Sequence, residues 1–453
     1  MAITMTPELA LATPSPEQVA WADCEIGVIF HLDLQVFRPD YDFRVWGSEP
    51  DPAVFAPTSL DTDQWIATAK AGGAKYAILV AKHGTGFSLW PTEAHGFSVK
   101  HSSWKSGRGD IVGDFIASCA KYGLRPGLYY HCGCNGYCQV DNPGRPVSGR
   151  VQDQQRYNHI VEQQLTELWT RYGKLFEIWF DGGTLLTELG GPSVASLLRT
   201  YQPQAVCFQG PRGACANLRW AGNERGFVEY PCWSTTHWKK TGVEVTHIPN
   251  APADHTDSEF PVYGPGDPAG ALWAPAENDM TLRRQDKAFG DGWMWREGED
   301  HLLYPLEELI ERYYTCVGRN ANLLAGLVID NRGLVPEADS ARWAAFGADI
   351  RRRFEAPIAE AAGAGTELLL PLDGPHAVNH VVLMEDIARG ERVRSFTVEG
   401  HAADGWRTLA MGSCIGHKFI ARFDTVAVNC LRVRVAASAG NPFFRKIATY
   451  LVD

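Results

Sequence analysis

The sequence has no excess of basic residues: its 42 Lys and Arg are outnumbered by 53 Asp and Glu, which gives a formal net charge of −11. Proteins that bind nucleic acid or an anionic membrane surface carry a basic patch that attracts phosphate groups. The chain also lacks an apolar run long enough to cross a bilayer. We therefore expect neither nucleic acid nor a membrane as a partner.

The cysteines lack the paired spacing of a structural zinc site. Eleven are scattered singly, and the densest group is His131-Cys132-Gly133-Cys134 with Cys138 nearby. The first twenty residues show neither a basic segment nor an apolar core, so we expect no secretory signal. Reduced thiols in a cytoplasmic protein are the simplest interpretation. We expect no metal and no organic cofactor.

Two enzyme signatures are missing as well. No glycine-rich phosphate-binding turn follows the first predicted strand, which argues against an open dinucleotide-binding sheet. No GxSxG turn follows a strand, which argues against a hydrolase with a Ser-His-Asp triad.

The chain does contain a regular alternation of apolar strands and amphipathic helices. The strands are predicted at 27–31, 76–81, 125–131, 175–181 and 205–209, with weaker ones at 218–224, 273–279 and 322–326. The helices are predicted at 62–72, 111–122, 153–172, 194–201 and 305–317. Eight strands alternating with helices over about 300 residues predict a (β/α)8 barrel.

The pattern changes after a helix predicted at 341–354 and a hinge of small residues at 361–365. Only short strands follow, which predicts a β-sandwich of galactose-binding-like type. We divide the chain into an N-terminal extension at 1–24, a barrel at 25–360 and a sandwich at 361–453. The sandwich either binds sugar or covers the barrel. We favour the role of covering the barrel, because the sandwich has few Trp side chains on which a sugar ring could stack.

Polar residues gather at the predicted C-terminal ends of the strands, where barrel active sites are built. The clearest case is KLFEIWFDGG at 174–183, in which an apolar strand runs into Asp181 and two glycines. The other residues in such positions are His31, His83, Tyr130, His131, Glu224 and Glu277.

Two carboxyl groups suffice to cleave a glycosidic bond with retention, one as nucleophile and one as acid and then base. Asp181 suits the nucleophile, because the glycines beside it leave room for a sugar ring. Glu224 and Glu277 both lie near Trp and small residues that could raise a carboxyl pKa, and the residues alone leave the acid open between them. The histidines are candidates for binding sugar hydroxyls.

Several stretches of the chain are similar to a known family. They are FAPTSLDTDQWIATAKAGGAKYAILVAKHGTGFSLWPT (55–92), KYGLRPGLYYH (121–131), EIWFDGG (177–183), VGRNANLLAG (317–326) and EDIARGERVRSFTVEG (385–400). From about residue 25 to its end, the chain resembles glycoside hydrolase family 29, the retaining α-L-fucosidases. The resemblance implies a retaining exo-glycosidase that removes terminal α-L-fucosyl residues from oligosaccharides or other glycoconjugates.

The resemblance also implies roles for single residues. Asp181 matches the nucleophile, and Glu224 matches the acid/base of the branch that carries a GNE motif and has a strict linkage preference. Glu277 ranks second for the acid. The residues implied to contact the sugar are His31, Trp46, His83, Trp90, Tyr130, His131, Glu277, Trp293 and Trp295.

The chain departs from the family pattern in two places. The family usually reads KHHDGF where residues 82–87 read KHGTGF, and it commonly reads EWG where residues 45–47 read VWG. Losing a side chain that binds a substrate hydroxyl changes selectivity by orders of magnitude. We expect Gly84 and Thr85 to free volume for a hydroxymethyl group. An α-L-glucosidase or α-L-galactosidase is therefore one alternative. A non-catalytic carbohydrate-binding relative is another, and a metal-dependent barrel hydrolase is a third.

Overall fold

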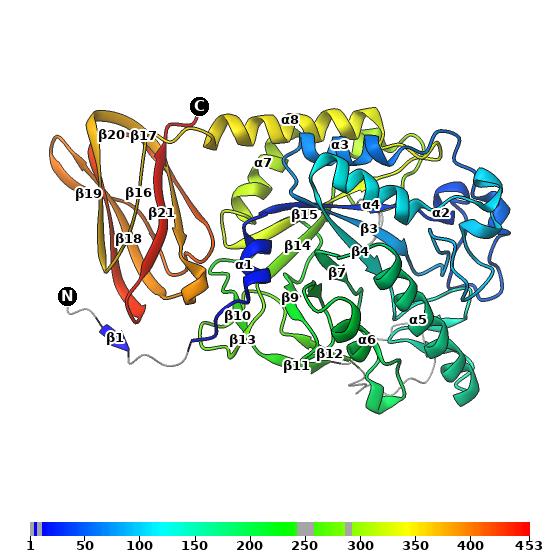
Figure 1. Ribbon diagram of the computed structural model, residues 1–453. Helices are drawn as coiled ribbons and strands as arrows, with labels where there is room; N and C mark the ends of the chain where they lie inside the picture. Colours follow the sequence, from blue (N-terminus) through cyan, green and yellow to red (C-terminus); the bar gives the residue numbers. More distant parts are fainter. Residues whose placement is uncertain (1–3, 7–10, 242–257, 286–291) are drawn as a thin grey trace.

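The computed structural model describes residues 4–6, 11–241, 258–285 and 292–453 (Figure 1). Eight parallel strands close into a barrel, in which each strand pairs with the next and the last pairs with the first. They are β2 (Ile26–His31), β3 (Tyr76–Lys82), β4 (Arg125–Tyr130), β7 (Glu177–Trp179), β8 (Val206–Phe208), β9 (Ala216–Trp220), β14 (Ala276–Thr281) and β15 (Ala321–Val328). The predicted barrel is confirmed.

Two of the predicted strand boundaries are wrong, and both bear on the site. Strand β9 ends at Trp220, so Glu224 lies in the loop beyond it. Strand β14 begins at Ala276, directly after a proline, so Glu277 is its second residue and does not lie near its C-terminal end. Trp273 instead belongs to β13 (Leu272–Trp273), which pairs with β10 (Thr235–Thr236). Because Pro275 cannot donate a hydrogen bond to a neighbouring strand, it separates β13 from β14.

Helices surround the barrel (Figure 1). They are α3 (Thr62–Ala71), α4 (Ile111–Tyr122), α5 (Val151–Arg171), α6 (Val194–Tyr201), α7 (Leu306–Thr315) and α8 (Glu337–Phe354), with a short α2 (Leu34–Phe37) at the rim. Capping fixes their ends: Asp110 accepts the Gly113 N–H before α4, and Gly123 takes a left-handed conformation after it. Short strands in the loops are β5 (Val140–Asp141), β6 (Arg145–Pro146), β11 (Trp238–Thr241) and β12 (Ser258–Pro261).

Helix α1 (Pro16–Ala22) closes the N-terminal end of the barrel. Ser15 and Gln18 form a capping box at its start. The Gln18 side-chain amide donates to the carbonyls of Asn217 and Trp273, at 2.8 and 3.0 Å. The buried Trp21 ring joins the side chains that fill the barrel interior. The predicted extension at 1–24 therefore contains a helix that packs under the barrel, although part of it lies outside the described residues.

The strand pleat divides the barrel side chains between two cores, because successive residues of a strand point to opposite faces. Tyr76, Ile78 and Val80 of β3 point into the barrel. Ala77 and Leu79 point outward into the larger core between the strands and the helices.

The C-terminal part is an antiparallel β-domain, as predicted, with a sandwich-like shape and its own apolar core (Figure 1). Its strands are β16 (Ala359–Ala364), β17 (Glu367–Glu385), β18 (Val393–Ala402), β19 (Gly405–Gly412), β20 (Phe419–Ala439) and β21 (Phe443–Tyr450). β1 (Thr4–Thr6) pairs in parallel with β20. The expected hinge at 361–365 is largely strand: β16 pairs with β21 through Ala364, and Gly365 turns the chain into β17.

A buried network joins the two parts. Asn320, just before β15, donates through Nδ2 to Glu391 at 2.6 Å and to the Cys232 carbonyl at 2.9 Å. Its Oδ1 accepts the His417 N–H at 2.6 Å. Within the described residues, none of the helices is both long enough and apolar enough to cross a membrane.

Candidate active site

A compact set of rings lines the C-terminal mouth of the barrel. The His31 ring lies 4.9 Å from the Trp293 ring and 5.9 Å from the His83 ring. The Tyr129 ring lies 5.9 Å from the His83 ring and 6.2 Å from the His131 ring. The predicted residues His31, His83, His131 and Trp293 are therefore brought together, and Tyr129 is in the same group.

Asp181 stands beside these rings, two residues after β7. Its Oδ2 accepts a hydrogen bond from the Tyr129 hydroxyl at 2.7 Å, and 43% of its side chain is exposed. Gly182 and Gly183 both have positive φ, which turns the chain sharply away. A Cβ on Gly183 would lie 2.1 Å from the Phe260 ring, so the close packing behind the carboxylate also requires glycine.

Glu224 faces the same space from the loop after β9. Its Oε2 accepts hydrogen bonds from Gln285 Nε2 at 2.7 Å and from Trp293 Nε1 at 3.0 Å. Burial raises the pKa of Glu224, the two donors oppose the rise, and the negative charge of Asp181 adds to it. The two carboxyl groups therefore act on each other electrostatically, and Glu224 is the one biased toward keeping a proton.

The site histidines are kept uncharged by burial. It lowers the pKa of His83 to about 3, and it lowers the pKa of His31 and His131 well below the usual value. Nδ1 of His131 accepts the backbone N–H groups of Gly133 and Cys134, so Nε2 carries the proton. That Nε2 lies 3.8 Å from Asp181 Oδ2, which is too far for a hydrogen bond and leaves the N–H available to a ligand hydroxyl.

Tyr130 lies on the wrong face of its strand for the predicted role. Its hydroxyl donates to Gln164 on α5 at 2.7 Å, and the ring is buried outside the barrel. Tyr129 points inward and contacts Asp181. Since side chains two residues apart share a face of a strand, Tyr129 accompanies His131 and Tyr130 does not. This alternation is the signal that would have found Tyr129 from the sequence.

Glu277 is enclosed in the barrel, away from the rim. It is fully buried, and its two oxygens accept the Tyr76 hydroxyl at 2.6 Å and the Trp179 indole N–H at 2.8 Å. The equally buried Glu177 lies beside it and accepts the Trp21 N–H at 2.9 Å. Burial, with the neighbouring Glu277, raises the pKa of Glu177 well above its usual value. Burial raises the pKa of Glu277 as well, but the hydrogen bonds from Tyr76 and Trp179 favour its charged form, so we expect the proton of the pair to lie on Glu177.

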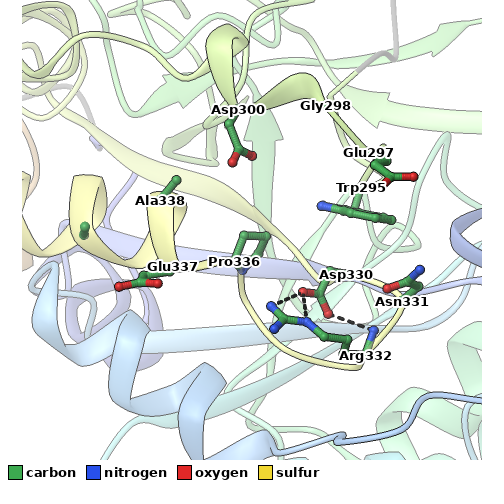
Figure 2. Close-up of a pocket in the computed structure, with 11 residues that line it drawn as sticks. Trp295, Glu297, Gly298, Asp300, Asp330, Asn331, Arg332, Pro336, Glu337 and Ala338 are labelled. Carbon is green, nitrogen blue, oxygen red and sulfur yellow. Dashed lines mark hydrogen bonds and ion pairs between the residues drawn. The ribbon is translucent and has the colours of Figure 1, made fainter.

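The other three predicted aromatic residues lie in different places. Trp90 is fully buried outside the barrel, where its N–H donates to Glu167 of α5 at 2.8 Å. Trp46 is half-buried in the loop after α2, three residues from Phe43. Trp295 is half-buried and lines a cleft together with Asp330 and other residues of neighbouring loops (Figure 2).

The space expected at Gly84 and Thr85 is filled. A Cβ on Gly84 would lie 2.7 Å from the Phe43 ring, which packs against the glycine. Thr85 is fully buried, and its hydroxyl lies 2.7 and 2.8 Å from the two carboxylate oxygens of Asp33. The expectation of free volume for a hydroxymethyl group at these positions is therefore wrong. The local sequence could not reveal this, because Phe43 comes from another loop.

The loop behind the site also holds the cysteine-rich stretch. Lys82 is fully buried, and its ammonium group donates to the carbonyls of His131 and Cys134. The Cys134 thiol lies 3.3 Å from Asp141 Oδ1. Across the described ranges, no three His, Cys, Asp or Glu side chains are grouped so as to hold a metal ion.

Comparison with known proteins gives a consistent result. Residues 32–353 match the family described as "Alpha-L-fucosidase". A protein of Oryza sativa subsp. japonica provisionally named alpha-L-fucosidase 1 is 31% identical, over 97% of this chain and 85% of that protein. A Bacteroides thetaiotaomicron crystal structure, provisionally named alpha-L-fucosidase, is 36% identical with a TM-score of 0.87, over 98% and 100% of the two chains. A glycoside hydrolase 29 family member from an unknown rumen bacterium is 29% identical with a TM-score of 0.78, over 98% of this chain and 78% of that one.

If the proton lies on Glu177, replacing Glu177 and replacing Glu277 by glutamine should affect the stability of the protein differently. Glu177→Gln keeps an acceptor for the Trp21 N–H and offers Glu277 an amide N–H in place of the protonated oxygen. Glu277→Gln turns an N–H group toward the Trp179 or Tyr76 donor, and we expect it to cost about 3 kcal/mol. The raised pKa of Glu177 means that wild-type stability falls as pH rises through the folded-state pKa, and Glu177→Gln removes this fall.

Urea denaturation of both variants near neutral pH and at about pH 9 measures these effects. An equal cost for the two substitutions would contradict a proton held on Glu177.

Proposed function

The chain belongs to the alpha-L-fucosidase family of glycoside hydrolases, and on this premise we propose that it hydrolyses terminal α-L-fucosides by double displacement with retention. The observation that carries the proposal is one arrangement at the barrel mouth. The Asp181 carboxylate is held by Tyr129 and faces Glu224, whose pKa is raised by burial. A pure binding protein has no need of such a pair.

In the first step, an oxygen of Asp181 attacks the anomeric carbon of the sugar as the bond to the leaving oxygen breaks. Glu224 gives its proton to that oxygen, so the leaving group departs neutral. The raised pKa of Glu224 favours the protonated form that this step needs. The Tyr129 hydroxyl keeps the attacking carboxylate oriented.

In the second step, Glu224 takes a proton from water as the water oxygen attacks the anomeric carbon of the fucosyl-enzyme. The bond to Asp181 breaks, and the carboxylate is restored. The neutral His31, His83 and His131 bind ring hydroxyls throughout. The proton on Nε2 of His131 makes that nitrogen a donor beside Asp181.

L-Fucose is the favoured sugar. A bulkier α-L-glucoside or α-L-galactoside would need free space at Gly84 and Thr85. Phe43 packs against Gly84 and Asp33 binds Thr85, so that space is filled and gives no reason to prefer the larger sugars. We also assign the enzyme to the branch with the GNE motif, because Glu224 follows Gly222 and Asn223 in this motif and faces Asp181, whereas Glu277 is enclosed in the barrel.

We further propose that the enzyme works in the reducing cytoplasm. All eleven cysteines are free, and eight of them are buried. Recovery of the native protein from a secreted or periplasmic fraction would contradict this assignment.

Asn278 of β14 fixes the loop that carries the acid. It is fully buried, and its Nδ2 donates to the carbonyl of Asn223 at 2.9 Å. Asn223 in turn accepts the Arg225 N–H through its own side chain at 3.0 Å. Glu224 lies between these two residues, so Asn278 positions the acid through the backbone.

The nucleophile is tested with an aryl α-L-fucoside. We expect Asp181→Ala to lower kcat at least about 1,000-fold, because the attacking oxygen is lost. Azide should restore cleavage of the aryl fucoside by attacking the anomeric carbon from the vacated space, and the product should be the β-L-fucosyl azide. Asp373→Ala, at a site 92% exposed on the β-domain, is the control and should keep the wild-type rate. Undiminished activity in Asp181→Ala would refute the assignment.

The positioning role of Asn278 predicts an effect that depends on the leaving group. Asn278→Leu keeps the side-chain shape but removes the donor. We expect kcat/KM to fall about tenfold for alkyl and sugar leaving groups, which need full protonation, and less than about twofold for a nitrophenyl group. An equal fall for both classes, or none, would contradict the role.

A further inference from the structure

A cleft of ≈ 700 Å³ opens between the loops that follow β14 and β15 and the start of α8. Figure 2 shows the Trp295 ring above the Asp330–Arg332 pair in that view, with Asp300 and Glu337 across the opening. The two loops contribute residues 295–300 and 330–332, and α8 contributes its first turn. The cleft is therefore on the same barrel face as Asp181 and Glu224.

The order of the strands places this cleft beside the strand that leads to Glu224, the acid that protonates the leaving oxygen. Most residues that surround the sugar belong to the first four strands of the barrel: His31 ends β2, His83 follows β3, Tyr129 lies on β4 and Asp181 follows β7. Trp293 is the exception, because it follows β14, the seventh strand. Glu224, which protonates the leaving oxygen, follows the sixth strand. The cleft follows the seventh and eighth strands, between the acid after β9 and His31 on β2.

Residues of the catalytic centre and of the cleft are close neighbours along the chain. Trp293, which donates to Glu224, lies two residues before Trp295. Val328, at the end of β15, pairs in register with His31, and Asp330 of the cleft lies two residues farther on. The loop that carries Asp330 therefore starts from a strand end that is paired with the site residue His31.

The lining has the character of a sugar-binding surface with a strong negative charge. An indole face stacks on the apolar face of a pyranose ring, and a nearby cation also favours it. Four carboxyl groups line the cleft, from Glu297, Asp300, Asp330 and Glu337, against the single guanidinium of Arg332.

Two of these carboxylates have a cationic partner, although Arg283 is shared with the buried Asp339 at 2.6 Å. Arg332 pairs with Asp330 at 2.7 Å, and the buried Arg283 pairs with Asp300 at 2.9 Å. Glu297 and Glu337 are exposed to the cleft and form no ion pair among the described residues. They leave an unbalanced negative charge where the leaving group would lie.

We propose that this cleft binds the leaving-group part of the substrate and selects uncharged or cationic groups against anionic ones, such as sialylated, sulfated or uronic-acid glycans. The inference rests on the proposed function and specifies its substrate class. Like charges facing each other across a partly desolvated contact disfavour binding, and this discrimination weakens as salt screens it.

The test uses phenyl α-L-fucosides whose para position carries one flexible amide chain ending in a hydroxyl, an ammonium or a carboxylate. The chain insulates the phenol, so the three leaving groups have the same intrinsic reactivity. We expect kcat/KM to be at least about fivefold higher for the ammonium than for the carboxylate at low ionic strength, with the hydroxyl between them. Added salt should shrink the ratio.

The variant Glu297→Gln with Glu337→Gln should reduce the ratio below about twofold and leave hydrolysis of unsubstituted phenyl α-L-fucoside unchanged. The matched control is Glu17→Gln with Glu355→Gln, which removes the same charge at the opposite end of the barrel, on α1 and just after α8. It should keep the wild-type ratio.

A ratio near one in the wild type, or an equal loss of the ratio in both double variants, would overturn the inference while leaving the proposed function in place. Inactivity toward every substrate, including the unsubstituted fucoside, would overturn the proposed function and this inference with it.

Discussion

The site depends on how one buried carboxylate orders the aromatic rings above it. Glu277 accepts the Trp179 N–H inside the barrel, which fixes the plane of the indole. That indole stacks on Phe208 with ring centres 3.8 Å apart and on Tyr129 at 5.3 Å. Tyr129 then reaches the Asp181 carboxylate at the rim. A displacement of the Trp179 ring would therefore shift Tyr129 and, through it, the nucleophile Asp181. The proton that we expect on Glu177 lets Glu277 stay ionised and accept hydrogen bonds in this apolar interior.

The acid is held in a different way, because Glu224 stands on a loop and not inside the barrel. Its carboxyl receives donors from Gln285 and Trp293, and its backbone is tied to β14 through Asn278. The donors stabilise the ionised form and burial opposes it, so the pKa of Glu224 reflects a balance between them. A group that must both give and take a proton in one cycle needs such a balance. The same Trp293 lies two residues before Trp295, which lines the cleft.

The sequence was sufficient for the parts of the molecule that repeat. The alternation of strand and helix predicted the barrel, and the position of Asp181 after an apolar strand predicted a rim carboxylate. Errors arose where one residue decides the face of a strand or where a distant loop intervenes. The sequence pattern favours Tyr130 next to His131 as a site residue, although neighbours in a strand point to opposite faces. Glu277 was placed at the wrong end of β14, because Pro275 begins that strand late. The ring of Phe43 against Gly84 joins two loops, and no local pattern indicates it.

The central claim is that Asp181 carries the sugar during turnover. Trapping with 2-deoxy-2-fluoro-α-L-fucosyl fluoride, followed by proteolysis and mass spectrometry, tests it most directly. The fluorine at C2 slows both steps, whereas the reactive fluoride at C1 restores only the first, so the covalent intermediate accumulates. The account predicts one fluorofucosyl group per chain, on the peptide that contains Asp181, and no labelling of Asp181→Asn. A label on another carboxylate, or turnover of the reagent with inversion and no label, would contradict it.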